Sequence, residues 1–233
     1  PENADDVAGL LKSADTAMYH AKQQGKDHYL FYQKEMDAAN IEKLILERDL
    51  REAINSEELK VVYQPQVDIS NGSVTGAEAL LRWEHRERGP ISPSRFIPLA
   101  EDIGLISDLG EWSLKIIGEQ LTKINQEIDR PLNISINISQ SQFNTRLVDF
   151  LKEMDKNNLI PLENLTLELT ENILLESSET NLRLINSLKS MGVLLSIDDF
   201  GTGFSSLSYL TKLPLDQLKI DLSCVLNLFN EEN

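Results

Sequence analysis

Residues 193–201 read VLLSIDDFG, a short apolar run that ends in two adjacent aspartates and a glycine. The run is too short for a buried helix, and its Val, Leu and Ile content is typical of a strand covered on both faces. The acidic pair stands where the strand ends, which is where α/β proteins carry their chemistry. This stretch therefore predicts one strand–helix unit with chemically active side chains at the end of its strand.

Similar apolar runs recur along the chain and alternate with helical patterns. We predict strands over residues 59–64, 74–82, 132–138, 165–170, 193–198 and 217–220. We predict helices over residues 93–103, 109–128, 145–157, 180–191 and 205–210. Asn71-Gly72 indicates a tight antiparallel hairpin between the first two strands, whereas the remaining strands are typical of βα units. The order predicts an α/β fold, either a parallel barrel or an open sheet.

The first 55 or so residues have a different pattern. Residues 7–24 form an amphipathic helical pattern, residues 28–32 a short aromatic strand, and residues 36–54 a second helical pattern. One helix and one strand make too small a core to fold alone. This region is therefore expected to belong to a neighbouring domain and a connector.

Composition limits the classes of partner. The chain has 233 residues, a net charge of −16 and a hydrophobic content of 41%, so it can build a core but lacks the basic surface that DNA, RNA or anionic membranes require. A nucleotide stays compatible with this charge if metal ions lie between its phosphates and acidic side chains. Cys224 is the only cysteine, which excludes an intrachain disulfide, and no apolar run is long enough to span a bilayer. We expect a cytoplasmic chain without membrane contact of its own.

Polar side chains interrupt the predicted strands near their carboxyl ends. They are Glu78, Asn137, Glu168, the pair Asp198-Asp199, and Lys219. The carboxyl ends of parallel strands meet on one face of a barrel or sheet, so these residues could form one cluster. Carboxylate and amide oxygens suit Mg²⁺ or Mn²⁺, and several carboxylates around one point favour two cations.

Simpler roles compete for each of these residues. Glu78 could be a solvated or salt-bridged strand residue, Asn137 could bond to a loop, and Lys219 could only neutralise a nearby carboxylate. Asp198-Asp199 could be a turn whose side chains cap backbone donors. The Gly201-Thr202-Gly203 segment fits a tight strand-to-helix turn at least as well as a phosphate-binding loop.

Seven ordered motifs give the sequence a resemblance to a known family. They are YQPQ at 63–66, EALLRW at 78–83, FIPLAE at 96–101, INIS at 136–139, ELTE at 168–171, DDFGTGFS at 198–205 and LKID at 218–221. Together they resemble the EAL domain, the bacterial cyclic di-GMP phosphodiesterase module. The resemblance implies a TIM-like (β/α)8 barrel with an antiparallel first strand, and hydrolysis of cyclic di-GMP to linear pGpG.

The resemblance also implies a role for individual residues. The implied metal ligands are Glu78, Asn137, Glu168, Asp198 and Asp199, which would hold two Mg²⁺ or Mn²⁺ ions, with Ca²⁺ inhibitory. Lys219 matches the lysine near the catalytic water, and Glu171 matches the glutamate that holds the loop after Asp198-Asp199. The implied substrate contacts are Gln64, Leu80 and Arg82. A homodimer is implied as well, and His20, His28 and His85 match no catalytic position.

The N-terminal segment has a resemblance of its own. Residues 7–32, with Ala14-Asp15-Thr16-Ala17-Met18-Tyr19, Ala21-Lys22 and Gly25-Lys26, resemble the closing helix and strand of a GGDEF (diguanylate cyclase) domain. We therefore expect residues 1–33 to be the end of a GGDEF domain, residues 34–55 a linker helix, and residues 56–233 the EAL domain. Upstream GGDEF and sensory regions are expected in the parent protein, which could be membrane-attached through them.

The family pattern continues beyond this chain. After LKID at 218–221 the family has further βα units, a Glu-Gly-Val-Glu-like metal-binding motif and a later glutamine, so we expect a barrel that lacks its final units. Two alternatives to a phosphodiesterase stay open on this ground. One is a receptor that binds cyclic di-GMP without cutting it, and the other is an inert fragment of the domain.

Overall fold

The structure is a computed structural model that describes residues 6–23, 27–128, 131–175, 179–201 and 213–227. It divides into two compact units, Pro1–Glu52 and Ala53–Asn233. The predicted helix over 205–210 lies outside the described residues. No described helix is both long and apolar enough to cross a bilayer.

The N-terminal unit contains two helices. Helix α1 (Val7–Gln23) begins after Asp6, whose Oδ1 accepts a hydrogen bond from the Gly9 amide at 2.7 Å. Helix α2 (Lys34–Ala53) follows within three residues of the predicted bounds. The predicted strand over residues 28–32 is wrong, because this segment is irregular. Strands need a hydrogen-bonded partner, and no other described segment of this unit is extended.

The second unit is built on a mixed sheet of seven strands. They are β1 (Leu59–Val67), β2 (Val74–His85), β3 (Gly89–Ile91), β4 (Asn133–Ile138), β5 (Leu165–Thr170), β6 (Leu194–Phe200) and β7 (Gln217–Ile220). Their order is β1-β2-β4-β5-β6-β7, with β3 on β2. The β1–β2 hairpin is antiparallel and turns at Gly72, whose φ of 75° suits glycine. All later neighbours on this path pair in parallel, so the predicted α/β class with an antiparallel first strand is confirmed.

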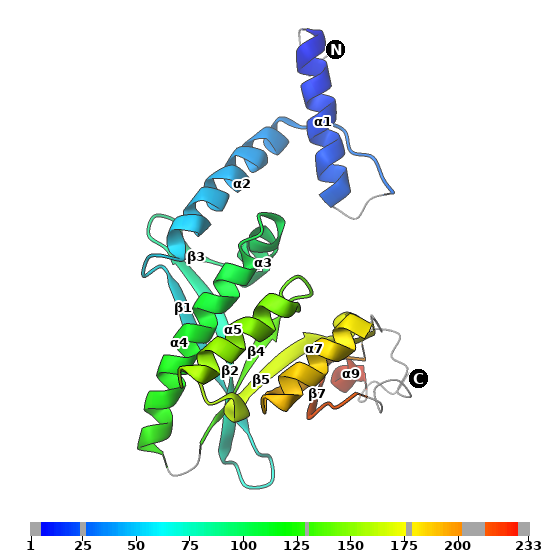
Figure 1. The fold of residues 1–233 in the computed structure, drawn as a ribbon. Coiled ribbons are helices and arrows are strands. Elements are labelled where there is room, and N and C mark those ends of the chain that lie inside the picture. Colours follow the sequence, from blue (N-terminus) through cyan, green and yellow to red (C-terminus); the bar gives the residue numbers. More distant parts are fainter. Residues whose placement is uncertain (1–5, 24–26, 129–130, 176–178, 202–212, 228–233) are drawn as a thin grey trace. The chain divides into compact units, whose positions relative to one another are not determined.

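Helices follow most of these strands. They are α3 (Pro93–Asp102), α4 (Ile106–Glu127), α5 (Thr145–Lys156), the 3-10 turn η1 (Leu162–Asn164), α6 (Glu171–Leu175), α7 (Glu179–Ser190) and α9 (Leu222–Asn227). Helices α4, α5 and α7 lie along one face of the sheet (Figure 1). The sequence patterns missed β3, α6 and α9, which have six residues or fewer and so little periodicity.

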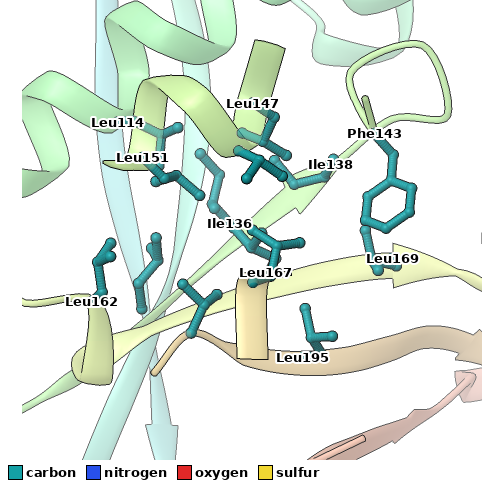
Figure 2. Packing of buried hydrophobic residues seen from close by; sticks show 14 of the residues in the cluster. Leu114, Ile136, Ile138, Phe143, Leu147, Leu151, Leu162, Leu167, Leu169 and Leu195 are labelled. Carbon is teal, nitrogen blue, oxygen red and sulfur yellow. The ribbon is translucent and has the colours of Figure 1, made fainter. Parts of the chain in front are cut away.

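The main hydrophobic core lies between this sheet face and the helices. Ile136, Ile138, Leu167 and Leu195 project from the strands toward Leu114, Leu147 and Leu151 of α4 and α5 (Figure 2). Because side chains alternate along a strand, the residues between them point to the opposite face, which we call the polar face. It carries Ser135, Thr166, Glu168 and Ser196, each at most 3% exposed. The strands are therefore buried on both faces as predicted, but only one face is apolar.

Candidate active site

The polar face collects functional side chains from successive strands because the pairing register shifts along the sheet. Glu78 of β2 is paired with Ser135 of β4, two residues before Asn137. Asn137 is paired with Glu168, and Asp198 of β6 is paired with Thr170, two residues beyond Glu168. Such a stagger is the expected consequence of strands that tilt as they do in a barrel. It brings polar residues from different strand positions to a common level.

Lys219 of β7 lies at the centre of this cluster. Its Nζ atom is 2.5 Å from Oε2 of Glu168, 3.1 Å from Oε2 of Glu78 and 3.1 Å from Oδ1 of Asp198. The lysine side chain is 24% exposed and that of Glu168 has no exposed surface. The sequence placed these four residues together but did not predict that the lysine would pair with three carboxylates at once.

Asn137 completes the connection between β2 and β4. Its Nδ2 atom donates to Oε1 of Glu78 at 2.7 Å, so the two carboxylate oxygens of Glu78 accept from Asn137 and Lys219 respectively. Asn137 thus orients Glu78 instead of bonding to a loop. Five strands and one central ammonium group form a single polar network.

Burial and charge shift the acidity of the central pair. Burial is the largest cause that raises the pKa of Glu168 above its usual value, and together with the charges of Glu78 and Asp198 it outweighs the hydrogen bond and charge of Lys219, which lower the pKa. Burial by itself lowers the pKa of Lys219, but the hydrogen bond and charge of Glu168, then those of Asp198, outweigh it and raise the pKa. The lysine is therefore held in its charged form by the carboxylates around it.

Asp199 follows Asp198 near the end of β6. Its φ of 54° is in the left-handed region, its amide donates to Oδ1 of Asp198 at 3.0 Å, and its side chain is exposed. Partial desolvation of its carboxyl by neighbouring groups is the largest cause that raises its pKa, the charges of Asp198 and Asp221 raise it further, and the charge of Lys219 lowers it. A non-glycine residue at such φ is strained, and strain of this kind concentrates at functional sites.

Glu171 begins α6 directly after β5. It is 7% exposed, and neither of its carboxylate oxygens has a hydrogen-bond partner among the described residues. The loop that the resemblance assigns to Glu171 falls largely on residues 202–212, which lie outside the described residues. The predicted role of Glu171 in holding that loop stays a prediction.

A cavity of about 290 Å³ opens beside the cluster. Its lining includes Leu80 and Arg82, both predicted substrate contacts, together with Asn137 and Glu168. Gln64, the third predicted contact, is paired with Glu78 across the β1–β2 hairpin and is not among the described lining residues. The volume is at the lower end of the range for small-ligand sites.

Sequence reasoning missed several residues that line the same cavity. Ser139, Gln142 and Thr170 are polar examples. Ser139 and Thr170 each follow a predicted ligand by two residues, so strand periodicity could have placed Thr170 on the polar face. Gln142 lies in a connection, and no periodic pattern indicates where such a side chain points.

The donor atoms of the cluster meet some of the requirements of a divalent cation. Among the described residues, no group of three or more His, Cys, Asp or Glu side chains is placed to hold a metal ion. The cluster nevertheless offers only oxygen ligands, and Oε1 of Glu168 is buried without a described hydrogen-bond partner. A buried, unpaired carboxylate oxygen fits a hard cation. The predicted ligand set therefore fits such a cation chemically, with Lys219 now bonded to three of its oxygens.

Comparison with known proteins identifies similar sequences. A family model described as "EAL domain" matches residues 47–233. The chain is 41% identical over 225 residues to the bifunctional diguanylate cyclase/cyclic di-GMP phosphodiesterase MucR of Pseudomonas aeruginosa, covering 96% of this chain and 33% of that protein. It is 37% identical over 228 residues to the cyclic di-GMP phosphodiesterase PdeR of Escherichia coli, covering 95% and 33%. The chain thus spans about a third of the length of these curated relatives.

Solved structures resemble the fold as well. The PaMucR phosphodiesterase in complex with c-di-GMP matches with a TM-score of 0.75 and 40% identity, over 80% of this chain and 76% of that one. The EAL enzyme Bd1971 in its cAMP- and cyclic-di-GMP-bound form matches with a TM-score of 0.74 and 30% identity, over 99% and 61%. Both the sequence and the backbone therefore resemble the same group of proteins.

Proposed function

Because this chain belongs to the EAL domain family, we propose that its polar cluster hydrolyses cyclic di-GMP to linear pGpG with the help of divalent cations. The single observation that carries the proposal is the convergence of Glu78, Glu168, Asp198 and Lys219 on one face, beside a cavity lined by Arg82. Two relatives named for cyclic di-GMP phosphodiesterase activity, 41% and 37% identical to this chain, support the choice of substrate.

The described residues supply binding and charge. Arg82 lines the cavity and presents a guanidinium group, which suits a phosphate oxygen or the edge of a guanine. Glu78, Asn137, Glu168, Asp198 and Asp199 would hold Mg²⁺ or Mn²⁺. Bound there, such cations would supply Lewis-acid activation of a water molecule and positive charge beside the attacked phosphate.

Lys219 has a second task in this scheme. Its ammonium group now neutralises three carboxylates. In the reaction, the same ammonium group would donate a hydrogen bond to the attacking water or to a phosphate oxygen. In the reaction the water oxygen bonds to phosphorus, one ester bond between phosphorus and oxygen breaks, and the departing oxygen takes up a proton.

A second candidate is a receptor that binds cyclic di-GMP without cutting it. The observation that favours it is that Lys219 bonds to an oxygen of each of three predicted metal ligands. Isothermal titration with cyclic di-GMP in Ca²⁺, together with a turnover assay in Mg²⁺ or Mn²⁺, separates the candidates. Binding with turnover that EDTA abolishes supports the phosphodiesterase, binding alone supports the receptor, and no binding leaves an inert fragment.

We also propose the domain arrangement that the sequence indicated. Residues 1–33 would end a GGDEF domain and residues 34–55 would link it to the EAL domain, which the full name of MucR and the share of its length that matches support. A homodimer is part of the same proposal. Light scattering of the purified protein tests it, because a monomer at all accessible concentrations would contradict it.

A further inference from the structure

The connection between β4 and α5 carries a buried glutamine that no proposed catalytic role uses. Gln142 is 8% exposed, although glutamine is usually a surface residue. Its Oε1 accepts a hydrogen bond from the Ser139 amide at 3.0 Å, and its Nε2 donates to the Ile106 carbonyl at 3.0 Å. The two bonds use one acceptor and one donor, so they fix the orientation of the side-chain amide.

These bonds join the end of β4 to the start of α4. Ser139 is two residues beyond Asn137, and Ile106 is the first residue of α4. The backbone closes the same turn, because the Ser139 carbonyl accepts from the amides of Gln142 and Phe143, both at 3.1 Å. Hydrogen bonds to both the amide and the carbonyl of Ser139 thus fix the direction in which the chain leaves β4.

A glycine makes room for this side chain. Gly110 lies on α4, one turn after Ile106, and a Cβ atom there would overlap Nε2 of Gln142 far inside van der Waals contact. Any other residue at this position displaces the amide from the Ile106 carbonyl. The helix therefore has a gap that matches the glutamine.

We propose that Gln142 is a positioning residue that holds Asn137 in place by tying the end of β4 to α4, and that Gly110 is needed to admit it. The proposal rests on the proposed function for its catalytic consequence. Asn137 orients Glu78 through the 2.7 Å bond. A shift of the β4 end therefore reaches the carboxylate cluster through Asn137.

Four variants test the proposal. Gln142→Ala removes both bonds, and Gln142→Glu keeps the volume but turns a carboxylate oxygen toward the Ile106 carbonyl. Gly110→Ala displaces the amide, and the fourth variant combines Gly110→Ala with Gln142→Ala. Arg146→Gln is the matched control, because Arg146 of α5 also bonds to α4, through Asp108 and Glu111 at 2.6 and 2.7 Å, at positions other than Ser139 and Ile106.

Three measurements distinguish positioning from general support. We expect hydrogen exchange of the Ser139 amide to be about tenfold faster in Gln142→Ala, as for one lost hydrogen bond, and nearly unchanged in Gln142→Glu, whose carboxylate oxygen still accepts from that amide. We expect kcat for cyclic di-GMP to fall about 10–100-fold with KM changed less than about threefold, since small displacements of catalytic groups act on the transition state. Titration with Mn²⁺ alone should show about tenfold weaker binding, the usual cost of losing support behind a ligand.

The double variant checks that Gly110 acts through Gln142. Gly110→Ala should cost little more once Gln142 is alanine, because the side chain that it displaces is gone. The proposal would be overturned if the losses in Gly110→Ala and Gln142→Ala added fully in the double variant. It would also be overturned if Arg146→Gln lost as much kcat and Mn²⁺ binding as Gln142→Ala. If the wild-type protein shows neither turnover nor Mn²⁺ binding, the proposed function fails. The exchange of Ser139 then decides by itself whether Gln142 fixes the β4 exit, and unchanged exchange in Gln142→Ala contradicts it.

Discussion

The Nζ atom of Lys219 lies 2.5 Å from Oε2 of Glu168, a carboxylate with no exposed surface. A charged carboxylate buried in this way is tolerated only when it is paired. The two residues are 51 positions apart and on different strands, so the pair couples the folding of β5 and β7 to the formation of the site.

Lys219→Met should therefore weaken the fold as well as the reaction. Removing the ammonium group leaves three carboxylates facing one another, and we expect the free energy of unfolding in EDTA to fall by about 1–3 kcal/mol, a range lowered because the lysine is partly exposed. Urea unfolding followed by circular dichroism measures the change. Turnover in Mg²⁺ should fall about 10²–10³-fold, the scale of one lost electrostatic contact to the transition state.

Lys189 offers a matched control for this variant. It pairs with Asp216 at 2.5 Å, and its side chain is also 24% exposed, but it lies away from the cluster. Lys189→Met should lose less stability, because Asp216 still accepts the Leu195 amide at 2.8 Å, and it should keep its turnover. Equal effects of the two variants on turnover would show that Lys219 has no special role.

Asp198→Asn should lower turnover without changing the fold. The amide has nearly the same shape and can still accept the Asp199 amide through its oxygen, but it loses the negative charge that a cation needs. We expect turnover to fall about 10³-fold with an unchanged circular dichroism spectrum. Steady-state kinetics in Mn²⁺ measure the loss, and turnover that survives would contradict the metal-dependent mechanism.

Strand periodicity was enough to predict most of the fold and the members of the cluster. Glu168 and Asp198 could be identified because each is a charged residue inside an otherwise apolar run. The pairing of both residues with Lys219 could not be predicted, because it depends on the register between neighbouring strands, which the pattern of a single strand does not encode. At residues 28–32 a strand was predicted that the structure does not contain. Their aromatic content favours a strand, but a strand forms only where a neighbouring segment pairs with it.

Gly201→Ala should disturb the site from the end of β6. Gly201 has a φ of 103°, and a Cβ atom there would overlap Sγ of Cys224 on α9. The backbone strain alone costs about 1–3 kcal/mol. We expect a lower melting temperature and lower turnover, because the displaced chain carries Asp198 and Asp199. Adding Cys224→Ala should restore part of the loss, since it removes the overlap but not the strain.

Gly72→Ala separates the effect of backbone strain from that of the overlap with Cys224. Gly72 has a φ of 75° at the β1–β2 turn, and a Cβ atom there would meet nothing within 4 Å. This variant should show a similar loss of stability from backbone strain but no loss of turnover. Rescue of Gly72→Ala by Cys224→Ala would refute the steric explanation.

Tyr63 should make stability depend on pH in the alkaline range. It lies on β1, packs against the core and donates from its hydroxyl to Oε1 of Gln120 on α4 at 2.5 Å. Burial raises the pKa of Tyr63 to about 12, above the value of about 10 expected in the unfolded chain. A raised pKa in the folded state means that the contribution is complete below about pH 10 and is lost as the pH rises toward 12.

The measurement is the difference in unfolding free energy between the wild-type protein and Tyr63→Phe, determined by urea unfolding at pH 9 and pH 11. The other tyrosines and the lysines titrate in both proteins, so their contributions cancel in the difference. We expect the advantage of Tyr63 to shrink by roughly 0.5–1 kcal/mol between the two pH values, since one pKa unit corresponds to at most about 1.4 kcal/mol and partial exposure of the ring reduces the effect. A difference that does not change with pH would mean that the Tyr63 hydroxyl is solvated, and that the link between β1 and α4 through Gln120 does not persist in solution.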